Sequence, residues 1–257
     1  MCLILVAWQA HPDYPLVVAA NRDEFFARPT SPAAFWPDRR LLAGRDLKDG
    51  GTWMGITRSG RFAALTNYRD PAKQREGTAS RGRLAIDFLC SDQPPLPWLR
   101  SGAAGASQYN GFNLIATDGK ELAWASNVSG DSAALPPGVY GLSNELLDSP
   151  WPKLVAGRSA LARALAALPD ERPLFELLRD DTIHPDEQLP RTGVSLEWER
   201  LLSSAFVKAP GYGTRSSTVL LVDRNGYVVF DEQTWLEDGG AGGRARFRFR
   251  RATSASS

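Results

Sequence analysis

The 257-residue chain is poor in the residues that build disulfide scaffolds and metal centres. It has two cysteines, too few for a disulfide framework, so a reducing cytoplasm is the expected location. It has two histidines, His11 and His184, so no bound metal is expected and few bases remain for a Ser-His-Asp triad. No apolar run approaches the roughly 18 residues of a membrane-spanning helix.

Net charge is also nearly absent, at +1, so no bulk field attracts the chain to nucleic acid or an anionic membrane. The apolar segment 2–8 lacks a basic region before it and is too short for a signal peptide. A small-molecule substrate or ligand is the expected partner. The oligomeric state is open.

Paired apolar segments around turn signals predict β-hairpins, because Asp-Gly and Asn-Gly favour tight hairpin turns. The four predicted pairs are 3–8 with 16–20, 51–57 with 61–68, 112–117 with 121–126, and 217–223 with 227–231. A further edge strand is predicted over 244–250, after a flexible loop over 237–243.

Helical periodicity is clearest over 149–168, where Ser149 is the predicted N-cap and Pro150 the first helical residue. Other helices are predicted over 80–90, 173–179 and 195–206. Runs of strands alternating with runs of helices predict an α+β fold, with antiparallel sheets covered by helices. We expect one domain over 1–250 and a disordered tail over 251–257.

Cys2 is the first candidate for chemistry. A small residue at position 2 permits removal of Met1, which would place a thiol and a free α-amine on one residue. The α-amine has a pKa of about 7.7–8.0 and can accept the thiol proton, so no histidine is needed. The alternative is that Cys2 is a small apolar residue opening a buried strand.

The polar run Asn21-Arg22-Asp23-Glu24 directly follows the apolar segment 16–20. Asp23 can hold an α-amine beside the thiol, and Arg22 can lower the thiol pKa or bind a carboxylate substrate. The alternative is a turn containing an internal Arg–Asp pair.

Three asparagines end apolar or aromatic stretches: Asn67, Asn113 and Asn144. A side-chain amide can donate to an oxyanion without titrating, although Asn113 can equally shape a turn and Asn144 a helix cap. Arg215 follows a glycine-containing loop that lacks the lysine and spacing of a phosphate-binding loop. It can project into a cleft or lie in solvent.

Eight tryptophans are present. Trp36, Trp53, Trp124 and Trp151 lie in otherwise apolar segments and are predicted in the core, where some can line an apolar pocket.

These segments together resemble the NRDE proteins, also called the transport and Golgi organisation 2 family. The resemblance rests on Met1-Cys2 with its apolar run, ANRDEF (20–25), RP (28–29), GGTWMGI (50–56), AALTNY (63–68), YNGFNL (109–114), YGLSN (140–144), PWPK (150–153) and GYGTR (211–215).

That family resembles the cysteine branch of the N-terminal nucleophile hydrolases, which includes penicillin V acylase and bile salt hydrolase. The resemblance implies a four-layer αββα sandwich of two antiparallel sheets. It implies Cys2 as nucleophile, Asp23 orienting it, Asn144 and Asn67 at the oxyanion hole, and Arg215 next to the cysteine. One departure is that Arg22 stands immediately before Asp23, whereas that branch has its arginine a few residues earlier.

The leading functional hypothesis is hydrolysis of a linear amide bond in a small acyl amide. Its catalytic residues would be Cys2, Asp23, Asn144, Arg215 and Asn67, and its substrate-binding residues Asn21, Arg22 and Asn113. No cofactor is expected. Because the resemblance also links the family to haem and lipid handling, the alternative is a non-catalytic protein that carries haem or an acyl lipid in the same cleft.

Overall fold

Two antiparallel sheets pack face to face in the structure, a computed structural model that describes residues 2–37, 41–102 and 107–252. Over these residues each sheet has seven strands. The first has the order β10-β1-β2-β12-β13-β14, and β11 pairs with β12; the second runs from β3 to β9 in chain order. The predicted pair of antiparallel sheets is confirmed.

The first sheet comprises β1 (Cys2–Trp8), β2 (Leu16–Phe25), β10 (Gly138–Leu142), β11 (Lys208–Ala209), β12 (Tyr212–Val222), β13 (Tyr227–Trp235) and β14 (Ala241–Arg250). The second comprises β3 (Thr30–Phe35), β4 (Leu41–Asp46), β5 (Met54–Thr57), β6 (Phe62–Asn67), β7 (Phe112–Thr117), β8 (Leu122–Ser126) and β9 (Ser132–Ala134). All four predicted hairpins are present, as is the edge strand over 244–250, which begins earlier, at Ala241.

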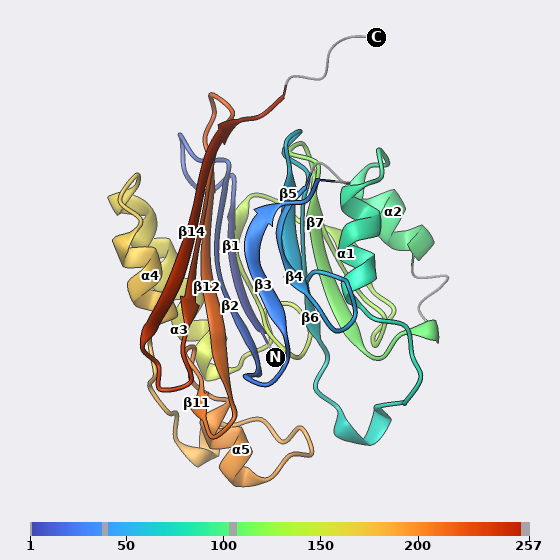
Figure 1. Ribbon diagram of the computed structural model, residues 1–257, viewed down its shortest axis with the longest axis vertical. Helices are drawn as coiled ribbons and strands as arrows, with labels where there is room; N and C mark the ends of the chain where they lie inside the picture. Colours follow the sequence, from blue (N-terminus) through green and yellow to red (C-terminus); the bar gives the residue numbers. More distant parts are fainter. Residues whose placement is uncertain (1, 38–40, 103–106, 253–257) are drawn as a thin grey trace.

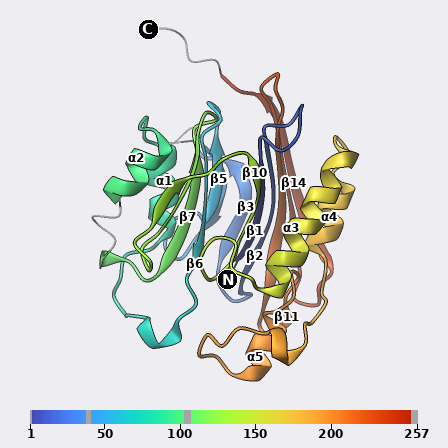
Figure 2. The same ribbon diagram turned by 180° about the vertical axis from the view of Figure 1, so that it is seen from behind.

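Helices cover the outer face of each sheet, which completes four layers (Figures 1 and 2). Against the first sheet lie α3 (Pro152–Ala164) and α4 (Arg172–Leu178). Against the second lie α1 (Gly82–Leu89) and α2 (Pro95–Gly102). At one end of the sandwich lies α5 (Leu196–Leu201), and the short 3-10 turns are η1 (Pro71–Lys73), η3 (Leu165–Ala167) and η4 (Asp186–Gln188).

The predicted start of the 149–168 helix is wrong by two residues. The helix begins at Pro152, and Trp151 is its N-cap residue. Ser149 does not cap it, because the Ser149 hydroxyl instead donates to the Leu146 carbonyl at 2.8 Å. Proline still occupies the first helical position, as expected from its fixed φ, but it is Pro152 rather than Pro150.

Alternation along β1 determines which side chains meet between the sheets. Ile4 and Val6 belong to the core between the two sheets, whereas Leu3 and Leu5 pack under the helices of the first sheet. Cys2 is in phase with Ile4, so its side chain points between the sheets. The fold therefore places the first strand residue at an end of the inter-sheet space.

The strand β2 is longer than its apolar segment predicts. It continues through Asn21-Arg22-Asp23-Glu24 to Phe25, because β1 and β12 pair with it on both sides. The polar run is thus part of the strand and not a turn after it. Neighbouring residues point to opposite faces, so Arg22 lies on the inter-sheet face and Asp23 on the helix face.

Of the tryptophans predicted in the core, Trp36, Trp124 and Trp151 are buried. Trp53 is half-buried and packs against both the inter-sheet core and the core under α1. Across the described ranges, no helix has the length and apolar character required to cross a membrane.

Candidate active site

Cys2 lies at the start of β1, beside a cavity of about 300 Å³ between the two sheets. Its cross-strand neighbour in β2 is Arg22. The cysteine is 8% exposed, and that surface faces the cavity. We call this space the Cys2 cavity. Its charged lining residues are Arg22, Arg28, Arg45, Arg81 and Arg215, with Asp23, Glu24, Asp46, Asp49 and Glu232.

The mixture of charges indicates a cavity suited to a polar ligand. Apolar lining is provided by Trp53 and Leu65, and Asn67 and Thr52 lie at the same wall. Ligand sites commonly combine such apolar walls with a few convergent polar groups. The Cys2 thiol is therefore next to a space that can hold a small molecule.

The Cys2 thiol is protonated at neutral pH in this environment. Burial raises its pKa to about 11, and the nearby Asp23 carboxylate acts in the same direction. Arg22 and a hydrogen bond from the Asp23 backbone N–H favour the thiolate but do not offset burial. A nucleophilic reaction at Cys2 therefore requires a base that takes the proton.

Asp23 is 1% exposed and lies on the helix face of β2. One carboxylate oxygen accepts the Thr214 hydroxyl at 2.7 Å, and the Asp23 backbone carbonyl accepts the Tyr212 hydroxyl at 3.1 Å. Burial raises the pKa of Asp23, whereas the positive charges of Lys153 and Arg69 lower it. The Asp23 side chain is thus held in place on the helix face of the sheet, near the start of β1.

Asn67 and Asn144 meet at the other side of Cys2. Asn67 lines the Cys2 cavity, and its side-chain amide makes no hydrogen bond to the residues that the structure describes. The amide nitrogen of the buried Asn144 donates to the Asn67 backbone carbonyl at 2.8 Å, and Asn144 does not line the cavity. Ser143 donates to the Cys2 carbonyl at 3.0 Å. Asn67 therefore has the amide that can reach a ligand directly.

Two predicted substrate-binding residues lie away from the Cys2 cavity. Asn21 is on the helix face of β2, where its amide nitrogen donates to the Leu178 and Ala205 carbonyls at 2.7 and 2.8 Å. The amide nitrogen of Asn113 donates to the Glu145 carbonyl at 2.8 Å. These contacts tie strands to the surrounding loops and helices, and they give no support to direct contact with a substrate.

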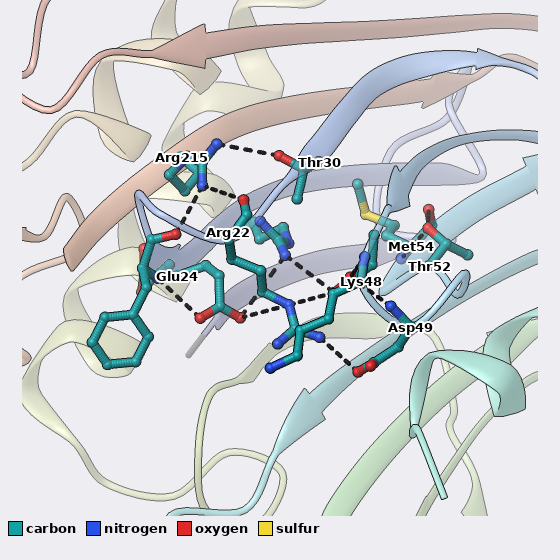
Figure 3. Close-up of polar contacts among 12 residues, drawn as sticks. Arg22, Glu24, Thr30, Lys48, Asp49, Thr52, Met54 and Arg215 are labelled. Carbon is teal, nitrogen blue, oxygen red and sulfur yellow. Dashed lines mark hydrogen bonds and ion pairs between the residues drawn. The ribbon is translucent and has the colours of Figure 1, made fainter. Parts of the chain in front are cut away.

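Arg22, the third such residue, lies inside the cavity. Its guanidinium is 3.8 Å from Glu24 and 3.7 Å from Asp46, longer than a good hydrogen bond (Figure 3). Arg28 holds Asp46 more closely, at 2.6 Å. Arg22 is therefore placed beside Cys2 within a partly neutralised cluster.

Arg215 also lines the Cys2 cavity, but its guanidinium supports a turn. It donates to the Phe25 and Arg28 carbonyls at 2.9 and 3.1 Å, and to the Thr30 hydroxyl at 3.2 Å (Figure 3). The register between β12 and β2 shifts at Arg215, as in a β-bulge that re-aims a side chain. Arg215 thus fixes the β2–β3 connection at the edge of the cavity.

Reasoning from the sequence missed a group of buried charges near Asp23. Lys153 is 3% exposed and donates to the Leu202 carbonyl at 2.8 Å. Burial lowers its pKa to about 8, against the opposing influence of Asp23. Arg69 and Glu199, both buried, pair at 2.8 Å. A signal was available, because Lys153 shares a helix face with the buried Gly157 and Leu161.

A further residue that the sequence reasoning missed is Arg81, for which no sequence signal was available. The sequence places it within the predicted helix 80–90, but it precedes α1, lines the Cys2 cavity and lies near Cys2. No group of three or more His, Cys, Asp or Glu side chains that could bind a metal ion occurs within 2–37, 41–102 and 107–252.

Comparison with known sequences gives matches over most of the chain. A sequence model of the family described as Transport and Golgi organisation 2 matches residues 1–237. The Transport and Golgi organization protein 2 homolog of Bos taurus is 39% identical over 92% of this chain and 94% of its own length. That of Homo sapiens is 38% identical over the same shares. Transport and Golgi organization protein 2 of Drosophila melanogaster is 30% identical over 91% of this chain and 92% of its length.

Comparison with solved structures identifies the fold. The C2A mutant of the conjugated bile acid hydrolase from Clostridium perfringens aligns with a TM-score of 0.51. The alignment covers 100% of this chain and 99% of that one, at 9% sequence identity. At this identity the likeness shows the fold alone, which is the predicted four-layer N-terminal nucleophile hydrolase sandwich.

Proposed function

The chain belongs to the Transport and Golgi organisation 2 family, and we propose that it hydrolyses a linear amide bond in a small acyl amide. The observation that carries this proposal is the position of Cys2. The residue that becomes the N-terminus on removal of Met1 lies at a strand end and lines a polar cavity.

Activation of the thiol follows from its electrostatics. The pKa of about 11 for buried Cys2 leaves little thiolate at neutral pH. After removal of Met1 the α-amine of the same residue, with an ordinary pKa of about 7.7–8.0, is the nearest base. Asp23, fixed behind the start of β1 by Thr214, orients that amine.

The reaction then proceeds in two balanced steps. The thiol proton passes to the α-amine, the sulfur bonds to the amide carbon, and Asn67 donates to the developing oxyanion. The C–N bond breaks as the α-ammonium returns the proton to the leaving nitrogen, leaving a thioester on Cys2. A water molecule then loses a proton to the α-amine and attacks the thioester carbon. The C–S bond breaks, the carboxylic acid leaves, and the α-ammonium returns its proton to the Cys2 sulfur.

The shared fold supports this chemistry. The Clostridium perfringens protein is a hydrolase, and its C2A mutant identifies a cysteine at position 2 of that chain as well. In this chain Cys2 opens the first strand. The proposed nucleophile therefore has the same residue number as the cysteine that was replaced in that hydrolase.

Mass spectrometry of the purified protein and an amidase assay test the proposal. We expect a mass without Met1, and release of nitroaniline from p-nitroanilides of short fatty acids. Cys2→Ala should abolish this release, whereas Cys90→Ala should leave it unchanged, because Cys90 is an exposed thiol outside the cavity. Retention of Met1, or equal turnover by Cys2→Ala, would rule the mechanism out.

The two asparagines can be separated in the same assay. Removing one oxyanion donor commonly lowers kcat by about 100-fold or more, so Asn67→Ala should show that loss with little change in KM. Asn144→Ala should act through the position of the Asn67 backbone, so it should alter stability together with activity. An unchanged kcat in Asn67→Ala would assign the oxyanion hole elsewhere.

A carrier function is the second candidate, because the relatives are named for transport and Golgi organisation and not for a reaction. In this case haem or an acyl lipid occupies the Cys2 cavity without chemistry. Cys2→Ala would then leave ligand binding intact. A titration with haem that produces no Soret shift would exclude the haem version.

A further inference from the structure

Arg81 is held at the wall of the Cys2 cavity by a close contact between two backbone segments. The carbonyl of Gly82, the next residue, accepts the Thr52 N–H at 3.3 Å. A Cβ added to Gly51 would lie 2.8 Å from the Gly82 carbonyl carbon, so these segments touch as only glycine permits. The start of α1, and Arg81 with it, is therefore fixed against the cavity.

The other arginines that line the cavity already have partners, which are carboxylates, backbone carbonyls or an aromatic ring. Arg28 pairs with Asp46 and Asp49, both at 2.6 Å. Arg22 lies between Glu24 and Asp46, and Arg215 donates to the carbonyls and hydroxyl of a turn. The exposed Arg45 stacks on Trp36, with 4.5 Å from the guanidinium carbon to the ring centroid.

Arg81 differs from these residues. Its Nη1 donates to the Gly111 carbonyl at 3.1 Å, which anchors one side of the guanidinium. Across the described parts of the chain, no carboxylate lies within ion-pair distance of Arg81, and its Nε and Nη2 groups make no hydrogen bond. Of the acidic groups, Cys2 is the one whose ionised form would act most strongly on Arg81, because the two side chains lie close together. Arg81 is thus a half-buried residue that lines the cavity beside the nucleophile, and it has two N–H groups that no carboxylate of the described residues binds.

We propose that Arg81 forms an anion subsite next to Cys2, and that the scissile amide of the substrate is close to a carboxylate. The chemical class this fits is an N-acyl amino acid, whose carboxylate an arginine can bind through two parallel N–H groups. This assignment of a substrate class rests on the proposed hydrolase function. The subsite itself depends only on the position of Arg81.

Paired alkylation with iodoacetate and iodoacetamide tests the subsite without requiring turnover. The two reagents are close in size, but only iodoacetate is an anion. We expect the ratio of their rates at Cys2 to exceed the ratio at the exposed Cys90, and to fall about tenfold in Arg81→Gln through loss of one nearby charge. Arg81→Lys should retain part of the preference.

The matched control is Arg83→Gln. Arg83 is 65% exposed, pairs with Asp87 at 3.1 Å and lies outside the Cys2 cavity, so its removal should leave the ratio at Cys2 unchanged. Cys90 follows the last residue of α1, so its own labelling rate reports whether the helix is intact in each variant. An unchanged ratio in Arg81→Gln would overturn the subsite.

A protection experiment on the unmodified sequence gives an independent readout. N-octanoylglycine should slow iodoacetamide labelling of Cys2 at concentrations where N-octanoylglycinamide does not. Equal protection by the charged and the neutral compound would overturn the subsite.

Hydrolysis assays separate this inference from the proposed function. If no amide is cleaved but Arg81→Gln still lowers the alkylation ratio, the subsite stands and the hydrolase proposal fails. If octanoylglycine and octanoylglycinamide are cleaved equally and Arg81→Gln cleaves both as well, the hydrolase stands and the carboxylate subsite fails.

Discussion

Cys2 lies at the end of a strand, lines a polar cavity and has a thiol whose pKa is raised to about 11 by burial. The position at the strand end and the contact with the cavity favour a nucleophile, whereas the raised thiol pKa opposes one because it leaves little thiolate. The α-amine released with Met1 is the group that can reverse this opposition, because it accepts the proton from its own side chain. Removal of Met1 is thus the step that would convert a buried apolar residue into a reactive one.

Lys153 gives a prediction about pH and stability. Its pKa is about 8 in the folded chain, below the ordinary value of 10.5. Between these values the unfolded chain keeps a proton that the folded chain has lost, so the free energy of unfolding rises with pH. Relative to Lys153→Met, the wild-type protein should gain about 2 kcal/mol between about pH 7.5 and pH 9.5.

Urea unfolding of both proteins at the two pH values measures this gain. Lys120→Met is the matched control, because Lys120 is exposed and lies at the Asp118-Gly119 turn. A stability difference between wild type and Lys153→Met that stays constant with pH would contradict the lowered pKa of Lys153.

At the scale of elements, strand alternation and one bulge organise the site. Because β2 is pleated, the Arg22 side chain lies in the cavity with Cys2, whereas the Asp23 side chain lies on the opposite, helix-covered face of the sheet. There the Thr214 hydroxyl donates to the Asp23 carboxylate. The register shift at Arg215 redirects that side chain to the β2–β3 turn. Neighbouring residues in one motif thereby have separate roles on the two faces of the first sheet.

The contact between the 50–52 segment and the start of α1 predicts that adding one methyl group at Gly51 will lower the stability of the protein. In Gly51→Ala the new Cβ would lie 2.8 Å from the Gly82 carbonyl carbon and 2.9 Å from its Cα. The Gly82 backbone cannot move away from the new Cβ as a flexible side chain could, so we expect the substitution to destabilise the protein by about 1–3 kcal/mol. Thermal unfolding measures it.

Gly243→Ala is the control for that substitution, because an added Cβ there meets nothing within 4 Å. If Gly51→Ala and Gly243→Ala have the same melting temperature, the 51–82 contact does not constrain α1.

At the scale of the whole molecule, β14 joins the two sheets at one edge of the sandwich. It extends the first sheet beside β13, and its Phe247 and Phe249 contact Phe35 of β3 edge to face, with ring centroids 5.6 and 5.5 Å apart. The match to the family ends at residue 237, so this strand lies beyond it. These aromatic side chains cover one edge of the space between the two sheets, and the Cys2 cavity lies in the same space.

Removing either phenylalanine should weaken this closure. Both side chains are half-buried, so Phe247→Ala and Phe249→Ala should each destabilise the protein by about 1–3 kcal/mol, less than for a fully buried ring. Arg248→Ala, at an exposed position between them, is the control and should change stability little. Equal urea midpoints for all three variants would contradict the role of β14.

Local signals determined much of this protein. The four hairpins were predictable because a short turn signal and the apolar segments on either side of it lie within a few positions of one another. The family was predictable because its motifs are read directly from residue order. The candidates Cys2, Asp23 and Asn67 followed from these motifs, and the structure places all three at one cavity.

Only the tertiary structure decided which polar residues face that cavity. Asn21 and Arg22 are adjacent in the sequence, but pairing on both sides of β2 keeps the strand regular and sends them to opposite faces. Arg81 and Lys153 come near Cys2 from distant parts of the chain, and no local pattern encodes such an approach. Their unusual environments arise from burial, which is a property of the assembled layers and not of any segment alone.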